Sequence, residues 1–130
     1  MRPRGPLRPP ILAVLIVGAS LVTGCVTDSR PATCHQDATT IELTVTATSM
    51  DPSNADACRG QDVVLVIDSE VDGVFHIHEL DDLVPATTIA AGDETTLEFT
   101  AERSGQFPVE LHAADDPQGV SIGILTLHEP

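Results

Sequence analysis

The chain has 130 residues, enough for one domain, and its formal net charge is −14, from six basic and 20 acidic residues. All six basic residues are Arg, which excludes a lysine Schiff base and a P-loop lysine. The excess of acidic residues would repel nucleic acid, and without Trp or Tyr a platform for stacking bases is unlikely, so we expect no nucleic-acid partner.

The first 22 residues have the pattern of a secretory signal. Residues 1–10 are rich in Arg and Pro, and residues 11–22 form an apolar run, ILAVLIVGASLV. This run is shorter than the ~20 apolar residues that a membrane-spanning helix needs. The pattern therefore predicts export rather than a transmembrane segment.

The run ends in Leu21-Val22-Thr23-Gly24-Cys25. This motif resembles the lipobox of bacterial lipoproteins, which implies cleavage before Cys25 and lipid attachment to its thiol. The expected organisation is then a signal peptide at 1–24, a lipidated tether at 25–40 and a domain at 41–130. The mature chain would carry three Arg against 20 acidic residues, a net charge of −17, at the extracytoplasmic face of the cell membrane.

Cys34 and Cys58 remain as a pair in an oxidising compartment, where a disulfide is the ordinary outcome. A bridge would close a loop of about 25 residues and stabilise the fold by roughly 3–4 kcal/mol in the chain-entropy description. Metal ligation by either thiol is the alternative, although neither lies in a CxxC cluster.

In chain order, runs of alternating or β-branched residues predict strands, and no stretch has the 3.6-residue period of a helix. Asp72-Gly73 indicates a hairpin, and Pro108 indicates an edge or a bulge because it cannot donate to a strand ladder. Several short strands in about 90 residues favour an antiparallel β-sandwich. The predicted strands are 41–47, 63–67, 74–80, 96–100, 107–112 and 120–128, with loops at 49–61, 81–94 and 113–119.

Three segments, VDGVFHIHEL, AGDETTLEFTA and SGQFPVELH, followed by a closing IGILTLHEP, resemble the cupredoxin-like domains of secreted bacterial proteins. The resemblance covers about residues 41–128 and implies a Greek-key β-sandwich. It also implies copper ligands: a His from an earlier strand, then a Cys, a His and usually a Met near the last loop. Here no Cys follows Cys58 and no Met follows Met50, so we expect no blue-copper site.

His76 and His78 stand two residues apart on a predicted strand and so face the same side. With His112 on a strand that could lie beside them, they are candidate ligands for copper, zinc or another divalent ion. The alternative is that these imidazoles are solvated or hydrogen-bonded side chains. His35 and His128 lie near the ends of the domain and are expected to be bystanders.

Three motif matches lack the context that their chemistry needs. Residues 68–79 resemble an EF-hand loop but follow a β-branched run instead of a helix. Residues 119–123 fit G-x-S-x-G without room for a hydrolase core, and the H-E-x-x-H pattern begun at His78 fails at Asp82. No catalytic constellation remains, so we expect no enzyme.

The sequence therefore predicts a membrane-anchored extracytoplasmic lipoprotein whose cupredoxin-like domain is a non-catalytic binding or accessory module. The alternative function is binding or delivery of copper or another divalent metal through His76, His78 and His112.

Overall fold

The computed structural model describes residue 5 and residues 32–130. Apart from residue 5, the described residues do not include the predicted signal peptide, the Cys25 lipidation site or the tether up to residue 31. Among the residues described, no helix is long and apolar enough to cross a membrane.

Over residues 32–130, nine strands and one short 3-10 helix build the domain, which is all-β as predicted. The elements in chain order are η1 (Ala32–His35), β1 (Ala38–Val45), β2 (Met50–Asp51), β3 (Asn54–Cys58), β4 (Asp62–Ser69), β5 (Gly73–Ile77), β6 (Thr87–Ile89), β7 (Glu94–Thr100), β8 (Gly105–His112) and β9 (Val120–His128). Because β1 begins at Ala38, the folded domain starts before the expected boundary at residue 41.

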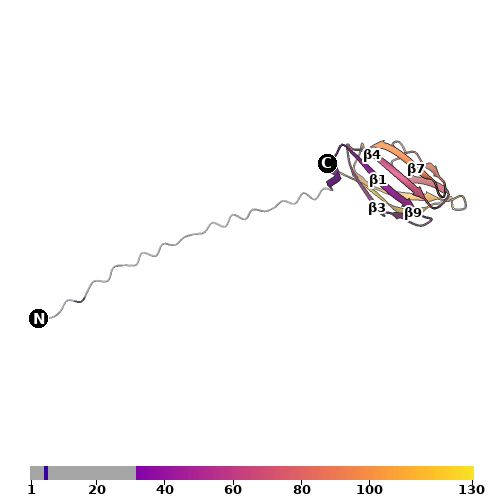
Figure 1. Ribbon diagram of the computed structural model, residues 1–130, viewed down its shortest axis with the longest axis horizontal. Helices are drawn as coiled ribbons and strands as arrows, with labels where there is room; N and C mark the ends of the chain where they lie inside the picture. Colours follow the sequence, from indigo (N-terminus) through magenta and orange to yellow (C-terminus); the bar gives the residue numbers. More distant parts are fainter. Residues whose placement is uncertain (1–4, 6–31) are drawn as a thin grey trace.

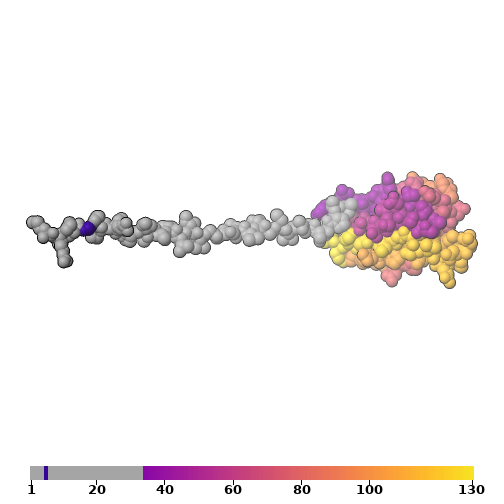
Figure 2. Space-filling model, turned by 90° about the horizontal axis from the view of Figure 1, so that it is seen from below, coloured from indigo at the N-terminus to yellow at the C-terminus, as the bar shows by residue number. Residues whose placement is uncertain are grey.

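The strands form two sheets that pack face to face. One sheet has the order β2-β1-β4-β7 and the other β3-β9-β8-β5-β6. Figure 2 shows the layers in profile, with the violet and magenta strands of the first sheet above the yellow end of the chain. The β-sandwich is confirmed, but its sheets are mixed rather than wholly antiparallel, because β1 pairs with β4 and β3 with β9 in parallel.

The alternation of apolar and polar residues along the strands explains why both sheets pack against one core. In β1, Ile41, Leu43 and Val45 are buried while the residues between them are exposed or partly exposed. The same period of two buries Phe107, Val109 and Leu111 in β8, whereas in β9 the buried residues Ile122 and Leu125 are three apart, beside the register shift between the two strands. Apolar side chains from both sheets meet between the layers and leave polar residues on the outer faces.

The predicted hairpin at Asp72-Gly73 is wrong. Strands β4 and β5 lie in different sheets, since β1 and β7 already occupy both sides of β4. Gly73 instead serves a close approach: a Cβ there would lie 2.8 Å from Cδ1 of Leu111 and 3.1 Å from the carbonyl oxygen of His112. Residues 70–72 therefore carry the chain from one layer to the other.

Two predicted loops contain strands. Residues 49–61 hold β2 and β3, and residues 81–94 hold β6. The polar residues of β3 hid its alternation, because Ala55 and Ala57 are its only apolar residues before Cys58. Pro108 fits the bulge alternative: β8 is an inner strand, and its register with β9 shifts between Val109 and Glu110.

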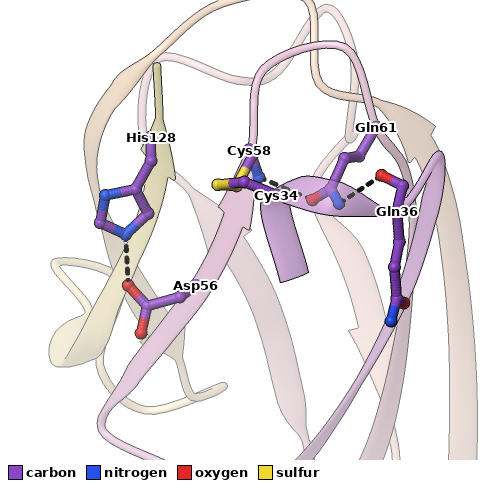
Figure 3. The surroundings of a disulfide bond; sticks show 6 residues. All are labelled: Cys34, Gln36, Asp56, Cys58, Gln61 and His128. Carbon is purple, nitrogen blue, oxygen red and sulfur yellow. Dashed lines mark hydrogen bonds and ion pairs between the residues drawn. A yellow bond between two sulfur atoms is a disulfide. The ribbon is translucent and has the colours of Figure 1, made fainter. Parts of the chain in front are cut away.

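A disulfide joins Cys34 in η1 to Cys58 at the end of β3, with their Cα atoms 5.3 Å apart. Figure 3 shows the Gln61 side chain beside it. Its Oε1 accepts from the backbone N–H of Cys58, and its Nε2 donates to the carbonyl of Gln36. These bonds fix the entry of the chain at the end of the sandwich where the C-terminus also lies (Figure 1).

Candidate metal centre

Strands β5 and β8 bring the candidate histidines together on the outer face of their sheet. The strands pair antiparallel, with His76 opposite Glu110 and Val74 opposite His112. His78 lies just beyond β5, and its backbone N–H donates to the carbonyl of Pro108. Since Phe75 and Ile77 point into the core, the histidines between and beyond them face outward together.

Glu110 lies at the centre of this group. Its Oε2 is 2.7 Å from Nε2 of His78 and 3.3 Å from Nε2 of His112. Ligand atoms of His76, His78 and Glu110 all lie within 4.8 Å of one another. The ring centroid of His76 is 4.6 Å from that of His78 and 5.7 Å from that of His112. The four side chains therefore form one compact cluster.

The histidines His78 and His112 each bury one ring nitrogen. The His78 side chain is 40% exposed and that of His112 is 28% exposed, yet Nε2 of each ring is buried. Neither Nε2 has a hydrogen-bond partner, so Glu110 approaches both within reach but from a direction that misses hydrogen-bond geometry. Buried polar atoms without partners cost free energy, and such atoms call for an explanation at each site.

Contacts on the outer side of the cluster determine which nitrogen carries the proton. Nδ1 of His112 lies 3.2 Å from the carbonyl oxygen of Pro117, which can only accept. In the neutral ring Nδ1 is therefore protonated, and Nε2 presents a lone pair to Glu110. By the same argument, Nε2 of His76 donates to Asp81 at 2.7 Å and leaves its lone pair on Nδ1.

The cluster favours the charged form of its carboxylate. The pKa of Glu110 lies below its ordinary value, chiefly because the His78 imidazole interacts with it at hydrogen-bond distance. Burial opposes this shift, while the nearby charges of His78, His112 and His76 add to it. Glu110 therefore stands ready as an anionic oxygen donor.

These donors fit a divalent cation. Two ligands bound tetrahedrally at about 2.1 Å lie roughly 3.3–3.4 Å apart, close to the separation of His112 and Glu110. The His78–Glu110 distance is shorter, so the two side chains would have to separate slightly. Imidazole nitrogens with one carboxylate suit Cu²⁺ and Zn²⁺, whereas Ca²⁺ prefers oxygen ligands alone.

A blue-copper centre does not fit the described residues. Both cysteines within them are joined in the disulfide, at the opposite end of the sheet from His112. Leu111, beside the cluster, points into the core. Without a thiolate, the electronic character of that centre is missing.

The structure thus brings together His76, His78 and His112, the three histidines predicted from the sequence. It adds Glu110, which sequence reasoning missed. The signal was present, because Glu110 and His112 stand two apart on an alternating strand and so share a face. His128 lies outside the cluster, hydrogen-bonded to Asp56 at 2.8 Å, as Figure 3 shows.

An open, apolar hollow adjoins His112. Its lining includes Val74, Ile89, Ala113 and Ala114, with Asp72 as its one charged residue. The Asp72 carboxylate accepts a hydrogen bond from the backbone N–H of Ala91. The hollow therefore lies beside His112, whose side chain is partly exposed.

No protein-family model and no curated sequence matches this chain. Solved structures do match. They include the apo form of a copper-binding protein (14% identity, TM-score 0.55), with 72% of this chain and 90% of that chain covered. A multicopper oxidase from Pseudomonas thermotolerans matches at 15% identity and TM-score 0.53, over 71% of this chain and 30% of that chain.

A copper nitrite reductase from Nitrosomonas europaea matches at 12% identity and TM-score 0.54, over 71% of this chain and 42% of that chain. This chain therefore spans less than half the length of either enzyme, at an identity that speaks for the fold alone. The shared architecture shows that the domain described above is a cupredoxin-like β-sandwich.

Proposed function

We propose that this protein binds a divalent metal ion, Cu²⁺ or Zn²⁺, through His76, His78 and Glu110, with His112 beside Glu110 as a further donor. The observation that carries the proposal is the pair of buried Nε2 atoms of His78 and His112, which both face Oε2 of Glu110 without hydrogen-bond geometry. A cation bound among them would satisfy all three atoms.

Of the two functions predicted from the sequence, we therefore favour metal binding over an accessory module that binds no metal. When the His112 ring is neutral, its Nε2 lone pair and the Glu110 carboxylate face each other as two acceptors and repel, and a bound cation would relieve this repulsion. The copper-binding protein of similar fold supports the choice of ion, since it shows that this architecture can carry a metal. The Irving–Williams order favours Cu²⁺ over Zn²⁺ at such a site.

We further propose that the protein acts as a lipoprotein at the extracytoplasmic face of the membrane, anchored through Cys25. The lipobox and the preceding apolar run support this location. The metal would then be stored or delivered outside the cytoplasm by a non-catalytic carrier. The net charge of the mature chain favours accumulation of cations near it.

Calorimetric titration of the full chain in detergent with Cu²⁺, Zn²⁺ and Ca²⁺ tests the proposal. We expect submicromolar binding of Cu²⁺ or Zn²⁺, lost in a His78→Ala/His112→Ala double variant. A His128→Ala variant is the matched control, because His128 also contacts a carboxylate but lies outside the cluster. Weak binding shared by all three ions and unaffected by the double substitution would mean that the acidic surface alone attracts them.

A further inference from the structure

The loop between β8 and β9 (residues 113–119) packs against the ring of His112. Two turns shape it, with the N–H of Asp116 bonded to the carbonyl of Ala113 and that of Gly119 to the carbonyl of Asp116. The Asp116 side chain also accepts from the N–H of Gln118. This bonding presents the Pro117 carbonyl to Nδ1 of His112.

Gly119 lies against the same ring. A Cβ at this position would be 2.7 Å from Cε1, 2.9 Å from Nδ1 and 3.0 Å from Nε2 of His112. Its φ of +77° is also one that residues with a side chain rarely adopt. The absence of a side chain at residue 119 thus allows the loop to close over the imidazole.

We propose that Pro117 and Gly119 are positioning residues for metal binding, and that they act through His112. The Pro117 carbonyl holds the proton on Nδ1, and Gly119 provides the space in which the ring keeps Nε2 turned toward Glu110. The loop contributes no ligand of its own; it orients one. This inference rests on the proposed metal-binding function and deepens it.

The physical basis is the contact behind a metal-bound imidazole. A hydrogen bond from the second ring nitrogen fixes the tautomer and the orientation of the ring, and loss of such an outer contact commonly weakens metal affinity about 10- to 100-fold. In this protein the acceptor is a backbone carbonyl, so its position depends on the loop and not on a side chain. The loop conformation and the affinity should therefore change together.

A comparison of two glycines tests the inference in the full chain. Gly92 has a φ of +83°, close to that of Gly119, but an added Cβ there would meet nothing within 4 Å. Gly119→Ala and Gly92→Ala should therefore strain the backbone to a similar extent. Only Gly119→Ala should weaken Zn²⁺ and Cu²⁺ binding, by about 10- to 100-fold, in competition with a chromophoric chelator.

Two further readouts separate positioning from general destabilisation. In a His112→Ala background, Gly119→Ala should cause no additional loss of affinity, because the ring through which it acts is gone. In the metal-free protein, nitrogen NMR should show His112 protonated at Nδ1, and Gly119→Ala should mix the two tautomers.

Wild-type affinity in Gly119→Ala, or an equal loss of affinity with and without His112, would overturn the inference. Failure of the wild-type chain to bind either ion would instead overturn the proposed function itself. The two failures therefore give different results.

Discussion

Nε2 of His112 and Oε2 of Glu110 face each other at 3.3 Å without a hydrogen bond between them. The His128–Asp56 pair on the same sheet differs, since it has hydrogen-bond geometry at 2.8 Å. Both pairs join an imidazole to a carboxylate, so chemistry alone does not explain the difference. The ligands of a shared cation direct their lone pairs at a common point rather than at each other, and the His112–Glu110 arrangement fits that case.

Removal of the charge on Glu110 should weaken metal binding more than removal of any other carboxylate. Glu110→Gln keeps the size of the side chain but replaces the anionic donor with a neutral amide. We expect affinity for Cu²⁺ or Zn²⁺ to fall at least about tenfold, by analogy with the 10- to 100-fold losses typical of weaker, outer contacts. Competition with a chromophoric chelator measures the change.

Glu98→Gln is the matched control, because Glu98 is exposed on β7 in the other sheet. It changes the net charge by the same amount but leaves the cluster intact. An equal loss of affinity in both variants would show that the protein's overall field, and not Glu110, holds the ion.

The lowered pKa of Glu110 predicts how the metal-free protein responds to acid. Because the folded state holds this carboxyl below its ordinary value of 4.5, the unfolded state binds more protons between the two values. The contribution of Glu110 to stability is therefore fully present above pH 4.5 and is lost as the pH falls through its folded pKa.

Chemical denaturation at several pH values on both sides of 4.5, the ordinary pKa of a glutamate side chain, measures this effect. The free energy of unfolding should fall less steeply with acidity in Glu110→Gln than in the wild type. Identical slopes for the two proteins would contradict the interaction between Glu110 and the histidines. A chelator added to every sample keeps the protein free of metal, so bound metal does not contribute to the measured stability.

The histidine cluster shows how far sequence reasoning reaches. Strand alternation was sufficient to put His76 and His78 on one face, because the period of two is local. The tautomer of His112 could not be predicted, because it depends on a carbonyl contributed by a loop five residues away. Glu110 was predictable from the same alternation, because it shares a face of its strand with His112.

The fold, too, was predicted only in part. The buried run of β4 and the alternation of β1 and β7 were predicted, because burial on one face leaves a local pattern. The pairing of β3 with β9 was not, because it joins residues about 70 positions apart and β3 offers mainly alanines to the core. Asp72-Gly73 was misinterpreted because a glycine needed for close packing resembles a glycine needed for a turn.

The disulfide should stabilise the fold without supporting the metal cluster. It closes a separation of 24 residues, which corresponds to about 3–4 kcal/mol of unfolding free energy. Cys34→Ser/Cys58→Ser should lose about this much in denaturant titration. Its metal affinity should stay unchanged while it remains folded, because β8 and β9 run from the disulfide end to His112 at the other. Reduced affinity in the folded variant would show that the two ends are coupled.

Cys25, the predicted lipidation site, lies outside the described residues. Conversion of Cys25 to Ser removes the thiol that a lipid would modify, so the protein should leave the membrane fraction or remain uncleaved. The described domain begins at η1, beside the disulfide, so the cluster lies toward the end of the sandwich away from the proposed anchor. Metal affinity of Cys25→Ser should therefore equal that of the wild type. Fractionation with immunodetection measures the location. A Cys25→Ser chain that is still processed and still sediments with membranes would refute the lipid anchor.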